Sequence, residues 1–251
     1  MTITKNIICM KWGTRYGPEY VNRLYSMVQR NLTPPYRFVC ITDDPTGLMN
    51  GIECKPIAPL NEKLPAHLKN KPWLKLLVWA NPLYDLVGQA LFIDVDVVIT
   101  GNLDDFFTFE PTQTFVAIEN WTELGKNTAN TSVFRFDIGA HPYILSNFEA
   151  DIAGTYAAHK IEQRYISRTI SQQTFWPKAW CRSFKEELLP PLPFRWWQAP
   201  KLPADARIVI FHGKPDPDEA LRGEWPVKQG QWWKKIYKTL PPTVWVGEHW
   251  R

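Results

Sequence analysis

The sequence has few cysteines, no long apolar run and no leader-like start. The four cysteines of this 251-residue chain form no CxxC pair or other spacing typical of a metal site. Three of them (Cys9, Cys40 and Cys54) lie in apolar, strand-like runs, where buried free thiols are the usual state. No apolar stretch approaches the roughly 18 residues that a membrane-spanning helix needs, and residues 1–11 lack the order of a signal peptide. We therefore expect a cytoplasmic protein, attached to a membrane at most peripherally, on its inner face.

The composition excludes a disordered chain but does not fix a partner. It is 45% hydrophobic and 22% charged, enough to build a core. The formal net charge of +4 suits a phosphate-bearing ligand, and it equally suits a protein without an electrostatic partner. The sequence contains no internal repeat, and its length fits one domain over residues 1–251. We expect no nucleic-acid partner.

Strand and helix signals alternate along the first half of the chain. Short apolar runs predict strands at residues 7–10, 36–42, 52–57, 90–93, 115–118, 133–136 and 208–211. Helices are predicted to begin at Pro18 and Pro72 and to fill residues 142–170. Residues 171–206 are irregular and rich in proline. The alternation predicts an α/β fold, with a mostly parallel sheet covered by helices on both faces and residues 7–10 and 90–93 near its centre.

Two aspartates, Asp94 and Asp96, directly follow the apolar run at residues 90–93. In parallel sheets, ligands bind beyond the carboxyl ends of the strands. Carboxylates this close repel each other. A bound Mg²⁺ or Mn²⁺ is the simplest way to neutralise them, because both ions bind carboxylate and phosphate oxygens. Such a metal would neutralise charge on a diphosphate leaving group. A solvated acidic turn is the alternative for an isolated D-x-D tripeptide.

The stretch from Leu91 to Phe107 closely resembles the metal-binding segment of retaining glycosyltransferases of the GT-A fold. It is most similar to the glycogenin and lipopolysaccharide galactosyltransferase group, family 8. Their segment runs from an apolar strand through D-x-D, apolar residues and a polar turn to Asp-Leu and an aromatic residue. The resemblance implies one Rossmann-like GT-A domain and a metal-dependent hexosyltransferase of polysaccharide biosynthesis. It further implies a nucleotide-sugar donor, expected to be a UDP-sugar, a saccharide or lipid-linked saccharide acceptor, and retention.

Further motifs follow in the order of that family. The segment after the first strand lies where the family binds the nucleotide, which implies donor contacts from Trp12, Gly13, Thr14 and Tyr16. Lys75 lies in a segment that resembles the family's helix carrying a basic residue toward the diphosphate. The alternative for Trp12 and Tyr16 is that they pack in the protein. The alternative for Lys75 is that it lies on a solvated helix face. The resemblance also implies that Asp94 and Asn130 contact the nucleotide-sugar.

The later motifs concern the donor sugar, the metal and the phosphates. Glu162 and Gln163 occupy the place of an Asp-Gln pair that faces the donor sugar, so we expect them to be catalytic. Gln163 is a poor nucleophile, and its amide suits stabilisation of an oxocarbenium-like transition state. His212 is expected to join Asp94 and Asp96 on the metal, and an imidazole beside carboxylates favours Mn²⁺ over Mg²⁺.

The sequence departs from the family pattern at several of these positions. Ser132 replaces a glycine, and Glu162 replaces an aspartate. His212 is followed at once by Gly213 and Lys214, which the family usually spaces apart and which we expect to contact phosphate.

The segment at residues 225–251 combines tryptophans with lysines. A basic, aromatic-rich segment suits the surface of an anionic membrane, where lipid-linked acceptors reside. The alternative is that its indoles pack on the domain.

Two other functions compete with sugar transfer. A haloacid-dehalogenase-type phosphotransferase also places D-x-D after a buried strand, but its motif normally opens the chain and needs a second acidic pair on a later strand. A non-catalytic carbohydrate-binding protein would explain the 13 tryptophans without a metal site.

Overall fold

The computed structural model describes residues 4–171 and 173–251 of the chain. They form two compact units, which are described in turn. Within the described residues, the first comprises 4–22, 33–95, 104–171 and 173–176, and the second comprises Arg23–Leu32, Asp96–Leu103 and Pro177–Arg251. The boundary between the units therefore passes through helix α1 (Pro18–Asn31) and through the Asp94-Val95-Asp96 segment.

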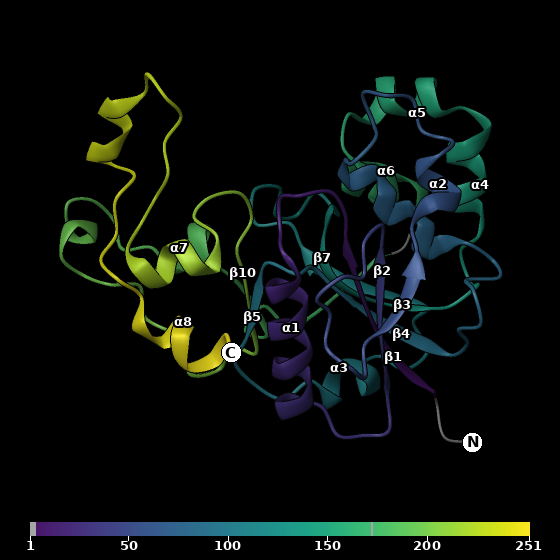
Figure 1. Ribbon diagram of the computed structural model, residues 1–251, viewed down its shortest axis with the longest axis horizontal. Coiled ribbons are helices and arrows are strands. Elements are labelled where there is room, and N and C mark those ends of the chain that lie inside the picture. Colours follow the sequence, from purple (N-terminus) through teal and green to yellow (C-terminus); the bar gives the residue numbers. More distant parts are fainter. Residues whose placement is uncertain (1–3, 172) are drawn as a thin grey trace. The chain divides into compact units, whose positions relative to one another are not determined.

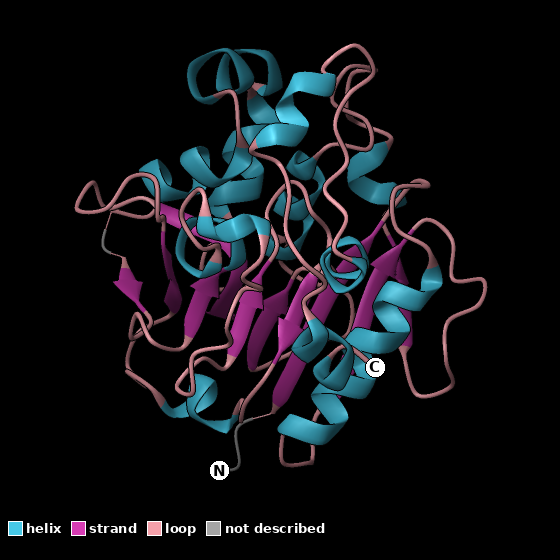
Figure 2. Cartoon of the chain, turned by 90° about the vertical axis from the view of Figure 1, so that its left-hand side faces the viewer, coloured by secondary structure: helices cyan, strands magenta, loops and turns pink. Residues whose placement is uncertain are grey.

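The first unit contains a seven-stranded sheet in the order β3-β2-β1-β4-β7-β6-β8. Its strands are β1 (Lys5–Lys11), β2 (Arg37–Thr42), β3 (Glu53–Pro56), β4 (Gln89–Ile93), β6 (Phe115–Glu119), β7 (Ala129–Asp137) and β8 (Thr174–Phe175). All neighbours pair in parallel except those of β7, which runs antiparallel to both β4 and β6. The strands lie side by side in Figure 2. The predicted, mostly parallel sheet is confirmed, and β1 and β4 are its third and fourth strands.

Helices cover both faces of this sheet. On one face, side chains such as Ile8, Phe92 and Phe134 form a core with buried or partly buried residues of the helices. These helices are α2 (Ala58–Asn61), η1 (Pro72–Trp79), α4 (Tyr143–Ala150), α5 (Ile152–His159) and α6 (Glu162–Thr169), and Figure 1 shows the four α-helices among them close together. On the other face, the buried Arg135 of β7 donates to the carbonyl of Phe106 in α3 (Asp104–Thr108). Because side chains alternate along a strand, Arg135 and its neighbour Phe134 point to opposite faces.

The second unit is built around a small sheet of β5 (Val97–Ile99), β10 (Ile208–Ile210) and β9 (Cys181–Ser183). Strand β10 pairs antiparallel with β5 and parallel with β9. The other elements are η2 (Phe184–Leu188), η3 (Phe194–Trp196), α7 (Pro217–Arg222), η4 (Trp232–Ile236) and α8 (Val244–His249). Helix α7 is specified locally, since Asp216 and Glu219 form a capping box and Gly223 ends the helix at a φ of 73°.

Two helical predictions change in detail. The segment from Pro72 is a 3₁₀-helix instead of an α-helix, and every residue from Trp73 to Trp79 is buried. The predicted helical region 142–170 is three short helices. One of them, α5, is capped by Asp151, whose carboxylate accepts from the Gly154 amide. Among the described residues, no helix is long and apolar enough to cross a membrane.

Candidate functional site

The loop after β1 lies beside the loop after β2. Gly13 adopts a φ of 59°, in the left-handed region that favours glycine. Its amide donates to Asp43 Oδ2 at 2.9 Å, which joins the two loops beyond the carboxyl ends of their strands. Trp12 is half-buried and packs against the core, whereas Thr14 is exposed. The half-buried Tyr16 stacks on Tyr20 with ring centroids 4.7 Å apart.

Lys75 and Asp94 form an ion pair at the end of β4. Lys75 is only 8% exposed because it lies on the inner side of η1, whose residues pack on the sheet. Its Nζ lies 2.7 Å from Asp94 Oδ2 and 5.5 Å from the centre of the Phe92 ring. The Asp94 amide donates to the carbonyl of Ser132 at 2.8 Å, so β7 fixes the backbone that carries the carboxylate.

The ion pair continues into a buried polar network. Lys75 Nζ also contacts the carbonyl of Thr131 at 3.5 Å. The Thr131 hydroxyl donates to Glu162 Oε1 at 3.2 Å, and both residues are buried. The structure thus links Lys75, Asp94 and Glu162, three predicted site residues that are far apart in the sequence. Asn130 lies next to Thr131 in β7, and its side chain accepts from the Ser132 amide.

Helix α6 places Glu162 in its first turn, with Gln163 next to it. Helix dipoles favour anionic groups at this position. Gln163 is half-buried, and its backbone carbonyl accepts from the Ser167 hydroxyl at 2.7 Å. That hydroxyl in turn accepts from the Ala129 amide at 2.9 Å. The start of α6 is therefore tied to β7, which carries Asn130 and Thr131.

In the second unit, Asp96 and His212 lie at the same end of the small sheet. Val97 of β5 pairs with Ile210 of β10 in antiparallel register. Asp96 immediately precedes Val97, and His212 follows Ile210 by two residues. Antiparallel pairing thus brings together two residues that are separated by more than one hundred positions.

The surroundings of His212 favour the neutral form of its imidazole. Its Nε2 is 2.7 Å from Ser183 Oγ, and that oxygen also accepts from the Glu186 amide. Burial lowers the pKa of His212, with a further lowering by the charge of Lys185 that Glu186 partly opposes. A neutral imidazole is the form that binds metals.

Lys214 and Gly213 follow on an exposed loop. Gly213 has a φ of 86°, and a Cβ there would meet no atom within 4 Å. Lys214 Nζ lies 2.6 Å from Asp216 Oδ2 and also pairs with Glu219. Both carboxylates belong to the capping box of α7, so this lysine would have to leave them to contact a phosphate.

The predicted residues are thus gathered in two places. The first unit joins Lys75, Asp94 and Glu162, and the second holds Asp96 and His212 at one sheet end. Within residues 4–171 and 173–251, no three His, Cys, Asp or Glu side chains are grouped so as to hold a metal ion. The joint binding of one metal by Asp94, Asp96 and His212 therefore stays a prediction.

Sequence reasoning missed three residues that organise these places. They are Asp43, which holds the Gly13 loop, Thr131, which connects Lys75 with Glu162, and Ser183, which contacts His212. The position of Asp43 directly after a predicted strand was an available signal. Nothing local marks Thr131, because its partners are distant in the sequence. Ser183 has a local role as the N-cap of η2, where it accepts from the Glu186 amide, but this role does not reveal its contact with the distant His212.

The chemistry of the expected donor set fits a divalent transition metal. Two carboxylates and a neutral imidazole are ligands that Mn²⁺ accepts, and the phosphates of a substrate would complete its shell. Lys75 already neutralises part of the charge of Asp94.

No family model matches the sequence, and no curated protein matches it. Solved glycosyltransferases do match the structure. The galactosyltransferase LgtC, in complex with donor and acceptor sugar analogues, superposes with a TM-score of 0.60 at 11% identity, over 84% of this chain and 88% of that one.

Two further structures are similar. The bifunctional glycosyltransferase WbbM has a TM-score of 0.61 at 11% identity, over 95% of this chain and 52% of that one. The glycosyltransferase GlyE of Streptococcus pneumoniae has a TM-score of 0.58 at 11% identity, over 98% of this chain and 63% of that one. Identities this low show a shared fold. The chain has the mixed α/β fold of these glycosyltransferases, as the Leu91–Phe107 resemblance predicted.

Proposed function

We propose that this protein is a metal-dependent glycosyltransferase that moves a hexose from a nucleotide-sugar, a UDP-sugar above all, to a saccharide or lipid-linked saccharide. The network of Lys75, Asp94, Thr131 and Glu162 carries the proposal. It lies at the end of β4, next to the antiparallel β7, in a fold shared with known glycosyltransferases. A buried lysine paired with a carboxylate beyond a strand end is typical of a site that holds a charged ligand.

The proposed donor contacts come from the residues that the sequence indicated. Trp12 and Tyr16 are aromatic groups suited to stacking on the base, with Gly13 and Thr14 beside them. Lys75 and Lys214 are cations suited to the diphosphate, and Asn130 and Gly213 complete the proposed contacts. Asp94, Asp96 and His212 would hold Mn²⁺ or Mg²⁺, and this metal would neutralise the charge on the diphosphate.

The transfer breaks the bond between the sugar C1 and the diphosphate oxygen, and that oxygen keeps the electron pair. The acceptor hydroxyl forms the new bond to C1, and on the route through the face that the phosphate leaves, its proton passes to the departing diphosphate oxygen. The half-buried Gln163 is proposed to stabilise the oxocarbenium-like transition state. Glu162 is proposed to bind sugar hydroxyls or to act together with Gln163. Retention would follow either from a protein nucleophile or from attack on the face that the phosphate leaves.

The acceptor and the cellular site form part of the same proposal. Exposed aromatic side chains of the C-terminal segment, such as Trp232 and Trp233, alternate with lysines. This combination suits peripheral contact with the inner face of an anionic membrane, from the cytoplasm, where a lipid-linked acceptor would be within reach.

Nucleotide binding tests the proposal most directly. UDP with Mn²⁺ should raise the melting temperature, because a ligand that binds only the folded state stabilises it. UDP without metal, and Mn²⁺ with adenosine, serve as controls. Slow hydrolysis of one member of a nucleotide-sugar panel without acceptor would then name the donor. No shift with any nucleoside diphosphate and Mn²⁺ would refute the assignment.

The two alternatives find less support. A haloacid-dehalogenase site needs a second acidic pair at the reacting centre. Here Asp216 caps α7 and pairs with Lys214, and Asp218 pairs with Arg222 at 3.0 Å, so these carboxylates have local structural partners. A carbohydrate-binding protein without catalysis would not respond to UDP and Mn²⁺.

A further inference from the structure

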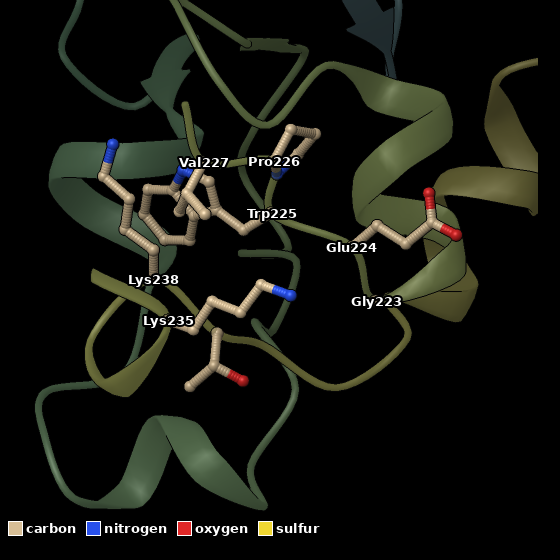
Figure 3. A pocket seen from close by; sticks show the side chains of 8 residues that line it. Gly223, Glu224, Trp225, Pro226, Val227, Lys235 and Lys238 are labelled. Carbon is tan, nitrogen blue, oxygen red and sulfur yellow. The ribbon is translucent and has the colours of Figure 1, made fainter. Parts of the chain in front are cut away.

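A separate pocket surrounds Trp225 in the second unit. It encloses about 500 Å³ and is lined by residues that follow α7 and by residues of the η4 region, among them Trp225, Lys235 and Lys238. Figure 3 shows these side chains around the hollow, with the Trp225 indole beside the side chain of Lys238. None of these lining residues belongs to the proposed donor site.

The Trp225 indole provides a hydrogen-bond donor without a partner. Trp225 is 9% exposed, and its buried Nε1–H has no hydrogen-bond acceptor among the described residues. A buried N–H group without an acceptor is costly, and native structures usually supply one from the protein, from water or from a ligand. An acceptor atom that reaches this N–H group from the pocket would remove that cost.

The charges at the pocket also favour an anion. Lys238 Nζ lies 6.0 Å and the Arg195 guanidinium carbon 5.9 Å from the centre of the Trp225 ring. Within the described part of the chain, neither Lys235 nor Lys238 forms an ion pair with a carboxylate. The one acidic residue of the lining, Glu224, pairs with Arg222 at 3.0 Å, and Figure 3 shows its carboxylate turned away from both lysines.

Exposed apolar side chains lie on η4, which contributes Lys235 to the pocket, and on η3, which is bonded to η4. On η4, which carries Lys235, Trp232 is 73% and Ile236 61% exposed. Helix η3 joins η4 through a hydrogen bond of 2.8 Å from Trp196 Nε1 to the carbonyl of Ile236, and Trp196 is itself 53% exposed. Tryptophan is enriched at the membrane–water interface, where its ring is half in contact with lipid.

We infer that the Trp225 pocket binds the phosphate group of an anionic lipid while the η3 and η4 aromatics insert among the neighbouring lipids. The phosphate oxygens accept from the indole N–H and pair with Lys235 and Lys238. The exposed indoles favour a lipid over a free phosphate compound, since a soluble ligand gains nothing from them. The inference deepens the proposed membrane contact and rests on it, whereas sugar transfer does not depend on it.

The test compares vesicle binding of the whole protein with that of charge-matched variants. Wild type should bind vesicles of phosphatidylglycerol and phosphatidylcholine and fail to bind vesicles of phosphatidylcholine alone. K235A/K238A should lose roughly thirtyfold in affinity, as expected for two lysines near an anionic surface. K69A/K71A removes two exposed lysines of the first unit and should lose less than about threefold. W225F keeps an aromatic ring but removes the N–H together with the pyrrole part of the indole, and should lose roughly threefold or more.

Each of the following outcomes would contradict one part of the inference. Equal losses in K235A/K238A and K69A/K71A would show diffuse attraction without a pocket. Absence of wild-type binding to phosphatidylglycerol would remove the membrane contact itself, and the melting shift with UDP and Mn²⁺ reports separately on the glycosyltransferase proposal. Tight binding of free glycerol phosphate without vesicle binding would reassign the pocket to a soluble ligand. Thermal melting of each variant shows that it is folded.

Discussion

The Lys75–Asp94 pair gives the most direct test of the network at the end of β4. The change Lys75→Met removes the ammonium and keeps most of the side-chain volume that packs against the Phe92 ring. It leaves the Asp94 carboxylate, whose side chain is 20% exposed, without its closest cation. Asp94→Asn leaves the ammonium of Lys75, which is 8% exposed, with a neutral neighbour.

The expected magnitude follows from burial. Breaking a fully buried pair by removing one partner costs about 3–5 kcal/mol. Since Asp94 retains access to water, we expect a loss of about 2 kcal/mol for Lys75→Met, after discounting for solvent screening. For a chain of this size, that corresponds to a fall of roughly 4–8 °C in melting temperature. Lys63→Met breaks a pair whose lysine is 57% exposed, and should change stability by less than about 0.5 kcal/mol.

A double-mutant cycle without added metal measures the coupling. Stability from urea unfolding of Lys75→Met, Asp94→Asn and the double variant should give a coupling of about 1–2 kcal/mol, because the double variant leaves no buried charge unpaired. Strictly additive losses would show that the two groups do not stabilise each other, and the network could then not be a preorganised site. Adding UDP and Mn²⁺ should stabilise wild type and fail to stabilise Asp94→Asn.

Three further predictions concern separate residues. Asp96→Ala should abolish the melting shift with UDP and Mn²⁺ while the unliganded melting temperature stays within a few degrees of wild type; a retained shift would remove Asp96 from the metal site. Gln163→Ala should lower kcat by roughly 100-fold with nucleotide affinity unchanged, since the residue acts on the reacting sugar. An unchanged kcat with lost nucleotide binding would show that Gln163 binds the donor and does not act in catalysis. Burial lowers the pKa of His141 below its ordinary value of 6.5, against an opposing effect of Asp137. The unfolded chain then binds more protons than the folded one, so stability should fall as pH drops through that value and level off below the folded pKa. Melting curves from neutral to mildly acid pH should show this fall and show less of it for His141→Gln; an identical pH profile in both proteins would contradict it.

Much of the fold was predictable because local patterns of apolar residues and prolines indicate it. The run at residues 90–93 is apolar throughout, and in the structure every residue of β4 is buried. Pro18 begins α1 as predicted, since its fixed φ suits the first turn of a helix. The start of η1 at Pro72 was predicted for the same reason, but its 3₁₀ geometry was not. Burial of all seven residues from Trp73 onward, including Lys75, is set by the sheet and helices around them.

The sequence by itself determined the alternation of buried strands and helices, the parallel core and the position of Asp94 and Asp96 directly after a central strand. These features depend on side-chain type and spacing within a few residues. Only the tertiary structure decided that Lys75 neutralises Asp94, that Thr131 connects this pair with Glu162, and that antiparallel pairing of β5 with β10 places Asp96 near His212. Such contacts join residues that are tens to more than one hundred positions apart. Their partners are selected by the packing of whole elements, which local sequence patterns do not encode.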